Sequence, residues 1–191
     1  DTCLQYGIFV MIDETYVEFA PEVSHISAIP LTNYYSNLII LRGTSKFFAA
    51  PGLRLGYAIT GNQGLIKSIN TRKNPRTINS LAEIAGRLMF PDEAYICHTR
   101  ELINGERDRI YQELKTWDSV TVYEPQANFI LMRIRRPDVS SQDLFDHCIR
   151  QGLMIRDCST FPFLDDRYVR FCIMKPEDNN RLLKAFKELL A

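Results

Sequence analysis

The sequence has few cysteines and none of the spacings that build a disulfide framework or a zinc site. Its five cysteines are an odd number, and no C-x-x-C pair occurs in 191 residues. We therefore predict free thiols in a reducing, cytoplasmic compartment and no bound metal. The three histidines lack H-E-x-x-H spacing and no G-x-S-x-G elbow is present, which argues against a metalloprotease and a serine hydrolase.

Long apolar segments and an excess of charge of either sign are also missing. No uninterrupted apolar stretch approaches the ~18 residues of a membrane span, and no signal-peptide pattern opens the chain. Lysine plus arginine equals aspartate plus glutamate, at 23 each, so no net field attracts nucleic acid or an anionic membrane surface. With 46% hydrophobic and 24% charged residues, the composition is that of an ordinary globular protein.

Three short apolar runs predict the strands of an α/β sheet. They are residues 7–12 (GIFVMI), 37–41 (NLIIL) and 55–60 (LGYAIT), all rich in β-forming side chains. Uninterrupted runs of this length are typical of parallel strands that are buried on both faces. Helices are expected after them, over 65–72 and over 78–90, where apolar residues recur at helical spacing.

A long helix and a smaller α+β unit are expected in the rest of the chain. Residues 92–117 read as one long, largely polar helix. The elements expected beyond it are strands over 120–123, 128–134, 153–156 and 168–173, a helix opened by a Ser140–Asp143 capping box, and a last helix from Pro176. We therefore predict three parts: a partial large domain over 1–91, a connecting helix over 92–118 and a small domain over 119–191.

Polar and charged side chains follow the first two predicted strands at their carboxyl ends, where ligands bind in open α/β sheets. Asp13 directly follows the first strand and Lys46 comes shortly after the second, with Tyr16, Ser45 and Arg54 in the same segments. A lysine amine can form an imine with an aldehyde, an acid can keep a pyridine nitrogen protonated, and an arginine can hold a phosphate. Pyridoxal phosphate makes these demands on its protein.

Each of these residues also has a simpler structural explanation. Lys46 alone could be a surface lysine, Tyr16 a packed aromatic at a strand end, and Ser45 a cap for local backbone. The ordered set favours the cofactor, because Tyr16 follows Asp13 by three positions and Arg54 follows Lys46 by eight.

Two segments carry a resemblance to a known family. MIDETYVEF (residues 11–19) and TSKFFAAPGLRLGY (residues 44–57) resemble signature segments of the class I/II aminotransferases, which are fold-type I pyridoxal-phosphate enzymes. They are most similar to the branch of histidinol-phosphate aminotransferase and threonine-phosphate decarboxylase, as are ANFILMRI and IRDCSTFPFLDDRYVRFCI further on. The resemblance implies the C-terminal part of a fold-type I large domain, mainly a parallel sheet with helices, then a small α+β domain, in a homodimer.

The resemblance also implies residue roles. Lys46 matches the catalytic lysine bonded to the cofactor, Asp13 the partner of the pyridine nitrogen, Tyr16 the hydroxyl at the phenolic oxygen, and Arg54 and Ser45 the phosphate ligands. Arg170 and Arg156 match arginines that bind the substrate carboxylate or phosphate. Without the resemblance, Arg170 could be solvated on an outer face and Arg156 could form a surface ion pair with Asp157.

The implied substrate is a phosphorylated amino acid or amine, but two reactions stay open. The family base rate favours transamination, as in histidinol-phosphate aminotransferase. Ala49 favours the decarboxylase, because the aminotransferase side of the branch often has glycine at that position.

The resemblance covers only the C-terminal half of the family pattern. Members normally have about as much chain again before this point, with a glycine-rich phosphate turn, an aromatic that stacks on the ring and an asparagine. The chain also begins at Asp1 without methionine. We expect a piece of a longer protein, and a non-catalytic folded fragment is the alternative to an active enzyme.

Overall fold

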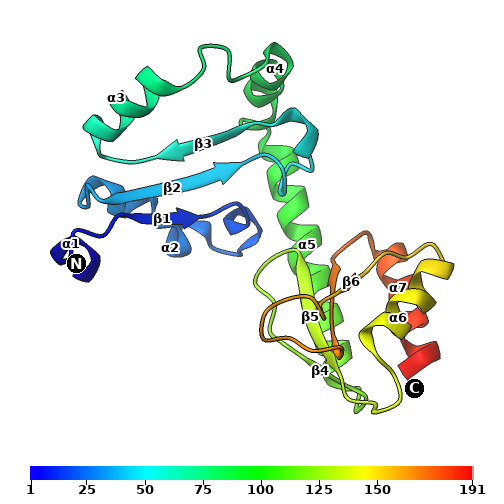
Figure 1. The fold of residues 1–191 in the computed structure, drawn as a ribbon. Helices are drawn as coiled ribbons and strands as arrows, with labels where there is room; N and C mark the ends of the chain where they lie inside the picture. Colours follow the sequence, from blue (N-terminus) through cyan, green and yellow to red (C-terminus); the bar gives the residue numbers. More distant parts are fainter. Residues whose placement is uncertain (191) are drawn as a thin grey trace. The chain divides into compact units, whose positions relative to one another are not determined.

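The computed structural model describes residues 1–190 and divides into two compact units, the first over Asp1–Cys97 and the second beginning at His98 (Figure 1). Each unit contains its own sheet, of three strands in the first and four in the second. Within residues 1–190, no helix combines the length and the hydropathy that a membrane crossing requires. The predicted three-part division of the chain stays a prediction.

The sheet of the first unit has the order β1-β2-β3, with β1 over Val10–Asp13, β2 over Leu38–Gly43 and β3 over Gly56–Ile59. All three predicted strands are present. β1 and β2 are parallel, whereas β3 runs antiparallel to β2, so this sheet is mixed. The short link between β2 and β3 contains only one turn of 3-10 helix, and a parallel return would need a longer crossover.

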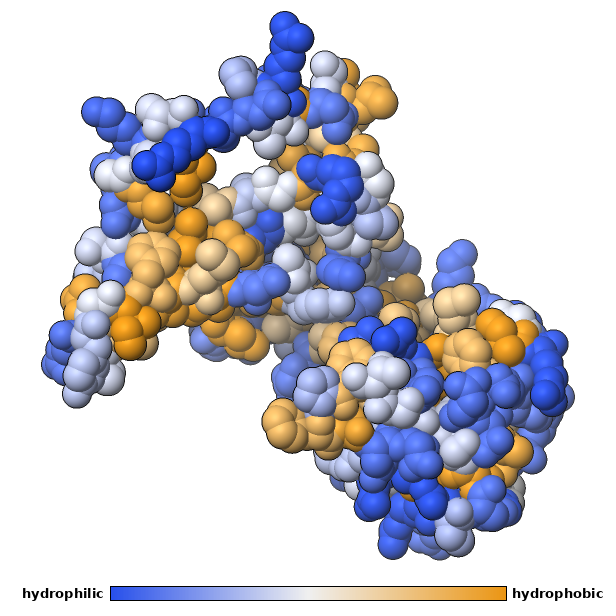
Figure 2. Space-filling view, in the orientation of Figure 1, coloured by the Kyte–Doolittle hydropathy of each residue, from blue (hydrophilic) through white to orange (hydrophobic). Residues whose placement is uncertain are grey.

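Burial in this sheet is uneven. Leu38, Ile39 and Ile40 of β2 are buried, as the apolar pattern predicts for a strand with two neighbours. The expectation of burial on both faces is wrong for β1 and β3, because Met11 is 64% exposed and Tyr57 is 40% exposed. Figure 2 shows apolar side chains gathered on the visible surface of the first unit.

The helical segments of the first unit surround this sheet. They are α1 (Thr2–Gln5), η1 (Val17–Phe19), α2 (Val23–Ile26), η2 (Ile29–Asn33), η3 (Pro51–Leu53), α3 (Gln63–Arg72) and α4 (Ser80–Met89), where η marks a 3-10 helix. The last two are the helices that the sequence predicts. Asn62 and Asn79 cap them, because their side chains accept hydrogen bonds from the backbone N–H of Leu65 and Ala82, both at 2.9 Å.

The long helix α5 spans Glu93–Lys115 and matches the prediction within two residues. Its apolar residues Ile103, Ile110 and Leu114 are buried, and Ile96 is half-buried. Arg107 is buried on the same helix, which hydrophobic spacing alone does not predict.

The second unit is a four-stranded antiparallel sheet covered by two helices. Its elements are β4 (Val120–Val122), β5 (Phe129–Ile134), α6 (Ser141–Arg150), β6 (Arg156–Asp157), β7 (Tyr168–Cys172) and α7 (Pro176–Leu190), with strand order β4-β5-β7-β6. The core lies between sheet and helices, where Met132, Val169, Leu144 and Phe186 are fully buried. Hydrophobic alternation along β5 and β7 predicts this arrangement, since residues of one strand face point to the helices.

The predicted capping box opens α6. Ser140 Oγ accepts a hydrogen bond from the Asp143 backbone N–H at 3.1 Å, and Asp143 Oδ2 accepts one from the Ser140 backbone N–H at 2.9 Å. The box fixes where α6 begins, which matters because the next residue, Ser141, faces β6.

Candidate active site

Three predicted site residues meet at one edge of the first sheet. Asp13 is the last residue of β1, and because β1 and β2 are parallel, the segment after β2 begins at the same edge. Asp13 is exposed, and its Oδ1 accepts a hydrogen bond from the Thr15 backbone N–H at 2.9 Å. Lys46 is also exposed, and its Nζ lies 5.5 Å from the centre of the Tyr16 ring. The lysine amine and the tyrosine are therefore neighbours in space.

Ser45 and Arg54 flank the point where the pairing of β2 and β3 ends. Thr44 extends the ladder, because its backbone N–H and its hydroxyl both donate to the Leu55 carbonyl oxygen at 3.1 Å. Ser45 directly follows this bonded pair and Arg54 directly precedes it. The hairpin therefore brings both residues to the edge where Lys46 lies.

Two non-glycine residues in this turn adopt left-handed backbone conformations. Arg54 has φ +53° and Ala49 has φ +49°. A side chain in this region costs roughly 1–2 kcal/mol relative to the right-handed form. Glycine would adopt the backbone angle of Ala49 without this cost, because glycine has no side chain. Strain of this kind is concentrated at functional sites.

The two cations assigned to the candidate site, Lys46 and Arg54, have no acidic partner in the part of the chain that the structure describes. Among residues 1–190, no carboxylate oxygen lies within 4.0 Å of Lys46 or Arg54. Arg54 Nη1 donates to the Pro51 carbonyl oxygen at 3.1 Å, which leaves further guanidinium donors. An amine, a guanidinium and a carboxylate are thus available to a ligand.

A partly buried ion-pair cluster, formed by Arg42, Glu14, Glu18 and Ser27, holds this edge together. The Arg42 guanidinium contacts Glu14 Oε2 at 2.8 and 3.1 Å, Glu18 Oε1 at 2.8 Å and Ser27 Oγ at 2.9 Å. Glu14 also accepts from Ser27 Oγ at 2.9 Å. Burial works to lower the pKa of Arg42, but its hydrogen bond to Glu14 and the two carboxylate charges outweigh burial and raise it.

The cluster sets the position of the proposed site residues through the chain. Glu14 is the neighbour of Asp13, and Arg42 precedes Lys46 by four residues near the end of β2. The Glu14–Arg42 pair therefore ties the carboxyl end of β1 to that of β2 beyond their last ladder pair, Asp13 with Leu41.

Aromatic packing around Phe47 holds the turn that carries Lys46 against the interior of the first unit. Phe47 is buried, with its ring 5.2 Å from that of Phe19 and 6.1 Å from that of Tyr95. Tyr95 also donates its hydroxyl to the Phe47 carbonyl oxygen at 2.9 Å. Because Phe47 points into the core, its neighbour Lys46 is held at the surface of the turn.

Sequence reasoning missed Glu14, Arg42 and Phe47 as supports of this edge. The available signals were charged residues directly after apolar strands and an aromatic residue inside a turn. Neither signal identifies a partner, because Arg42 and Glu14 are 28 positions apart.

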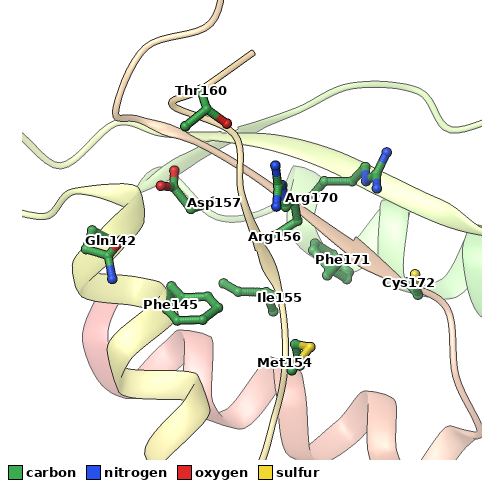
Figure 3. A pocket seen from close by; sticks show the side chains of 10 residues that line it. All are labelled: Gln142, Phe145, Met154, Ile155, Arg156, Asp157, Thr160, Arg170, Phe171 and Cys172. Atoms are coloured by element: carbon green, nitrogen blue, oxygen red, sulfur yellow. The ribbon is translucent and has the colours of Figure 1, made fainter.

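The second unit brings Arg156 and Arg170 together. They are directly paired across β6 and β7, and both line a surface hollow of about 580 Å³ (Figure 3). The Arg170 guanidinium lies 4.8 Å from the centre of the Phe129 ring, and that of Arg156 lies 5.4 Å from the Phe161 ring. These aromatic faces favour cations.

The two arginines also lack an acidic partner. Within the described residues, no carboxylate oxygen is within 4.0 Å of either guanidinium, so the alternative of an Arg156–Asp157 ion pair is not observed. Like charges directly opposite each other in a sheet are destabilising. An anion between them would remove this repulsion.

The predicted site residues therefore form two groups. Asp13, Tyr16, Ser45, Lys46 and Arg54 belong to the first unit, and Arg156 and Arg170 to the second. Each group is assembled by contacts within its own unit.

Comparison with known proteins identifies the family. The model of the family "Aminotransferase class I and II" matches residues 1–186. The chain belongs to this family. It is 36% identical to a putative threonine-phosphate decarboxylase of Caldanaerobacter subterraneus, over 96% of this chain and 49% of that protein. It is 33% identical to the histidinol-phosphate aminotransferase of Desulfitobacterium hafniense, over 96% of this chain and 48% of that protein.

Two solved structures share the fold. The histidinol-phosphate aminotransferase from Clostridium acetobutylicum superimposes with a TM-score of 0.91 at 35% identity, over 98% of this chain and 56% of that one. L-threonine-O-3-phosphate decarboxylase from Porphyromonas gingivalis matches with a TM-score of 0.84 at 24% identity, over 96% of this chain and 55% of that one. The α/β fold is thus that of the fold-type I aminotransferases, and the chain spans about half the length of the curated relatives it matches.

Removal of the central arginine should destabilise the first unit. We expect Arg42→Met to lower the free energy of unfolding of the full-length protein by about 3 kcal/mol, because it leaves the buried Glu14 carboxylate without its cation. Urea unfolding followed by circular dichroism measures the change. Arg76→Met, at an exposed position, is the control and should change stability by less than about 0.5 kcal/mol. Equal, small effects of both variants would show that the cluster is not a stabilising contact.

Proposed function

We propose that the full-length protein containing this chain is a pyridoxal-phosphate enzyme that transaminates a phosphorylated amino acid or amine, as a histidinol-phosphate aminotransferase does. The observation that carries the proposal is the exposed, unpaired Lys46 amine beside Tyr16, at the sheet edge that ends in Asp13. Membership of the aminotransferase class I and II family supports it.

The residues at this edge fit the proposed cofactor. Lys46 offers a primary amine for the aldehyde, and Asp13 offers a carboxylate for the pyridine nitrogen. Tyr16 would hydrogen-bond the phenolic oxygen, while Arg54 and Ser45 would bind the phosphate. No carboxylate within the described residues competes for Lys46 or Arg54, which supports the assignment.

Pyridoxal phosphate, when bound, supplies an aldehyde and an electron-accepting ring. The chain would supply the remaining functions. The Asp13 carboxylate would hold the proton on the ring nitrogen. The Lys46 Nζ would take the proton that leaves the substrate Cα and deliver it to the cofactor carbon, since a neutral amine within reach can act as a general base and then as a general acid. Tyr16, Ser45 and Arg54 would keep the ring in one orientation.

Substrate recognition would fall to Arg156 and Arg170. Two unpaired guanidiniums on adjacent strands fit a phosphate, alone or with a carboxylate, because each guanidinium can donate two parallel hydrogen bonds. Phe145 and Met154 give the same hollow apolar walls, which would contact the uncharged part of the substrate.

The second candidate reaction is decarboxylation of threonine phosphate. Two relatives named as threonine-phosphate decarboxylases, one of them putative, are 36% and 33% identical to this chain. Two features of the chain itself favour this reaction: Ala49, at a position where the aminotransferase side of the branch often has glycine, and the segment over residues 156–170. The same lysine, aspartate and arginines would serve both reactions, and the grip on the substrate anion would decide which bond to Cα breaks.

We further propose that the full-length protein is a cytoplasmic homodimer. A non-catalytic role for the chain on its own remains the alternative of another class. It is favoured by exposed apolar side chains on the first unit, such as Met11 and Leu81, which an isolated enzyme would normally cover.

Replacement of the lysine tests the cofactor assignment. We expect the full-length protein, purified with pyridoxal phosphate, to show a visible absorbance band that borohydride removes, with the label mapped to Lys46 by mass spectrometry. Lys46→Arg should lose the band and reduce turnover at least ~1000-fold, because a guanidinium neither bonds to the aldehyde nor releases its proton. Lys67→Arg, at an exposed position of α3, should keep both. A label on another lysine would disprove the assignment.

Product analysis separates the two reactions. We expect glutamate from histidinol phosphate and 2-oxoglutarate, and no carbon dioxide from threonine phosphate. The opposite pair of results would favour the decarboxylase. Neither product, in a protein that carries the cofactor label on Lys46, would contradict both substrate proposals while leaving the cofactor proposal intact.

Thiol labelling tests the anion site without turnover. Cys172 lines the hollow with the two arginines, and Cys97, in the first unit, is also exposed. We expect inorganic phosphate to slow N-ethylmaleimide labelling of Cys172 and not of Cys97, and Arg170→Met to abolish the protection. Cys148 should stay unlabelled in the native protein, because burial raises the pKa of its thiol to about 11. Equal labelling of Cys172 with and without phosphate would argue against the anion site.

A further inference from the structure

Asp157, next to Arg156, is bound by two serines and not by an arginine. Its Oδ1 accepts from the Ser141 hydroxyl at 2.7 Å and from the Ser159 backbone N–H at 2.9 Å. Its Oδ2 accepts from the Ser159 hydroxyl at 2.7 Å. The Asp157 carboxylate therefore accepts hydrogen bonds from neutral donors that lie before and after it in the sequence. It does so although the preceding residue, Arg156, carries a guanidinium.

The donors connect three elements around the anion site. Ser141 is fully buried at the first turn of α6, and its backbone N–H donates to the Asp166 carbonyl oxygen at 2.7 Å. Ser159 begins the loop that carries Thr160 and Phe161. Thr160 lines the hollow that contains the two arginines, and the Phe161 ring contacts Arg156. Asp157 thus ties β6 to α6 on one side and to this loop on the other.

The strand that carries Arg156 is short, although its pairing with β7 continues at Cys158, whose backbone N–H donates to the Tyr168 carbonyl oxygen at 2.9 Å. β6 contains two residues, paired to β7 as Arg156 with Arg170 and Asp157 with Val169. So short a strand gains little from its ladder. Side-chain hydrogen bonds from a buried helix terminus add restraint to this strand, since charge-assisted bonds are about twice as strong as neutral ones.

We infer that Asp157 is a positioning residue for the two-arginine site. Through Ser141 and Ser159 it fixes Arg156 opposite Arg170, and its own charge stays bound to hydroxyl and amide groups, so both guanidiniums remain available to the phosphate of the substrate. This inference rests on the proposed function, in which Arg156 and Arg170 bind the substrate anion.

The ionisation of Asp157 agrees with this role. Burial works to raise the pKa of Asp157, but the hydrogen bonds from Ser159 and Ser141, with a smaller contribution from the positive charge of Arg156, outweigh it, so the pKa lies below its usual value. The carboxylate is consequently charged at neutral pH. A carboxylate that acted only through its charge would repel a bound phosphate, so its removal would tighten binding. Positioning predicts the opposite sign.

The test is steady-state kinetics of the full-length holoenzyme with the phosphorylated substrate that it turns over. We expect Asp157→Ala to raise KM about tenfold with kcat changed less than about twofold, because a slight displacement of a binding group weakens its contact. Ser141→Ala should raise KM less, and the Ser141→Ala/Asp157→Ala double variant no more than Asp157→Ala alone, since one contact is lost in each case. Asp157→Asn, which keeps one accepting oxygen, should lie nearer the wild type.

The controls separate this inference from the proposed function. Asp118→Asn, an exposed residue of the same unit, should leave KM and kcat unchanged. A normal or lowered KM for Asp157→Ala, with a raised KM for Arg156→Ala, would overturn the positioning role and leave the arginine site standing. An unchanged KM for Arg156→Ala and Arg170→Ala would overturn the proposed function, and the positioning role with it. The phosphate concentration that half-protects Cys172 from N-ethylmaleimide gives a readout independent of turnover and should rise for Asp157→Ala.

Discussion

The candidate cofactor site depends on one partly buried interaction, the ion pair of Arg42 with the buried Glu14. Buried charges are costly unless they are paired and hydrogen-bonded. Arg42 satisfies this condition with contacts to Glu14, Glu18 and Ser27 at 2.8–3.1 Å. The resulting cluster joins the ends of β1 and β2, so Asp13 and Lys46 are presented from a rigid edge. A catalytic amine needs such support, because small displacements of a reacting group reduce rates strongly.

Pairing distinguishes structural cations from candidate functional ones in this chain. Arg42 is half-buried and donates hydrogen bonds to two carboxylates and a serine hydroxyl, so it stabilises the fold. Arg156 and Arg170 lie in a hollow with no carboxylate oxygen within 4.0 Å among residues 1–190. Asp157 contributes to this difference between paired and unpaired arginines. It is the acid nearest in sequence to Arg156, and it already accepts hydrogen bonds from Ser141 and Ser159.

The sequence predicts local features well and long-range ones poorly. The Ser140–Asp143 capping box and the start of the last helix at Pro176 are found as expected, because both depend on residues a few positions apart. The direction of β3 and the Glu14–Arg42 pair are not predicted, since apolar runs do not encode strand direction and ion pairs across 28 positions leave no periodic signal. The order of Asp13, Tyr16, Lys46 and Arg54 points to the cofactor edge, whereas the groups that hold this edge become visible only in the fold.

Both candidate sites carry a local cost that a ligand would offset. Arg54 and Ala49 have left-handed backbones, each unfavourable by roughly 1–2 kcal/mol, and Arg156 faces a like charge across the sheet. Local choices that conflict with stability are expected where function has determined them. An anion at each site would be attracted by the unpaired guanidiniums, and between Arg156 and Arg170 it would also relieve their repulsion. The same groups that make the free protein locally unfavourable would therefore make the binding of phosphate favourable.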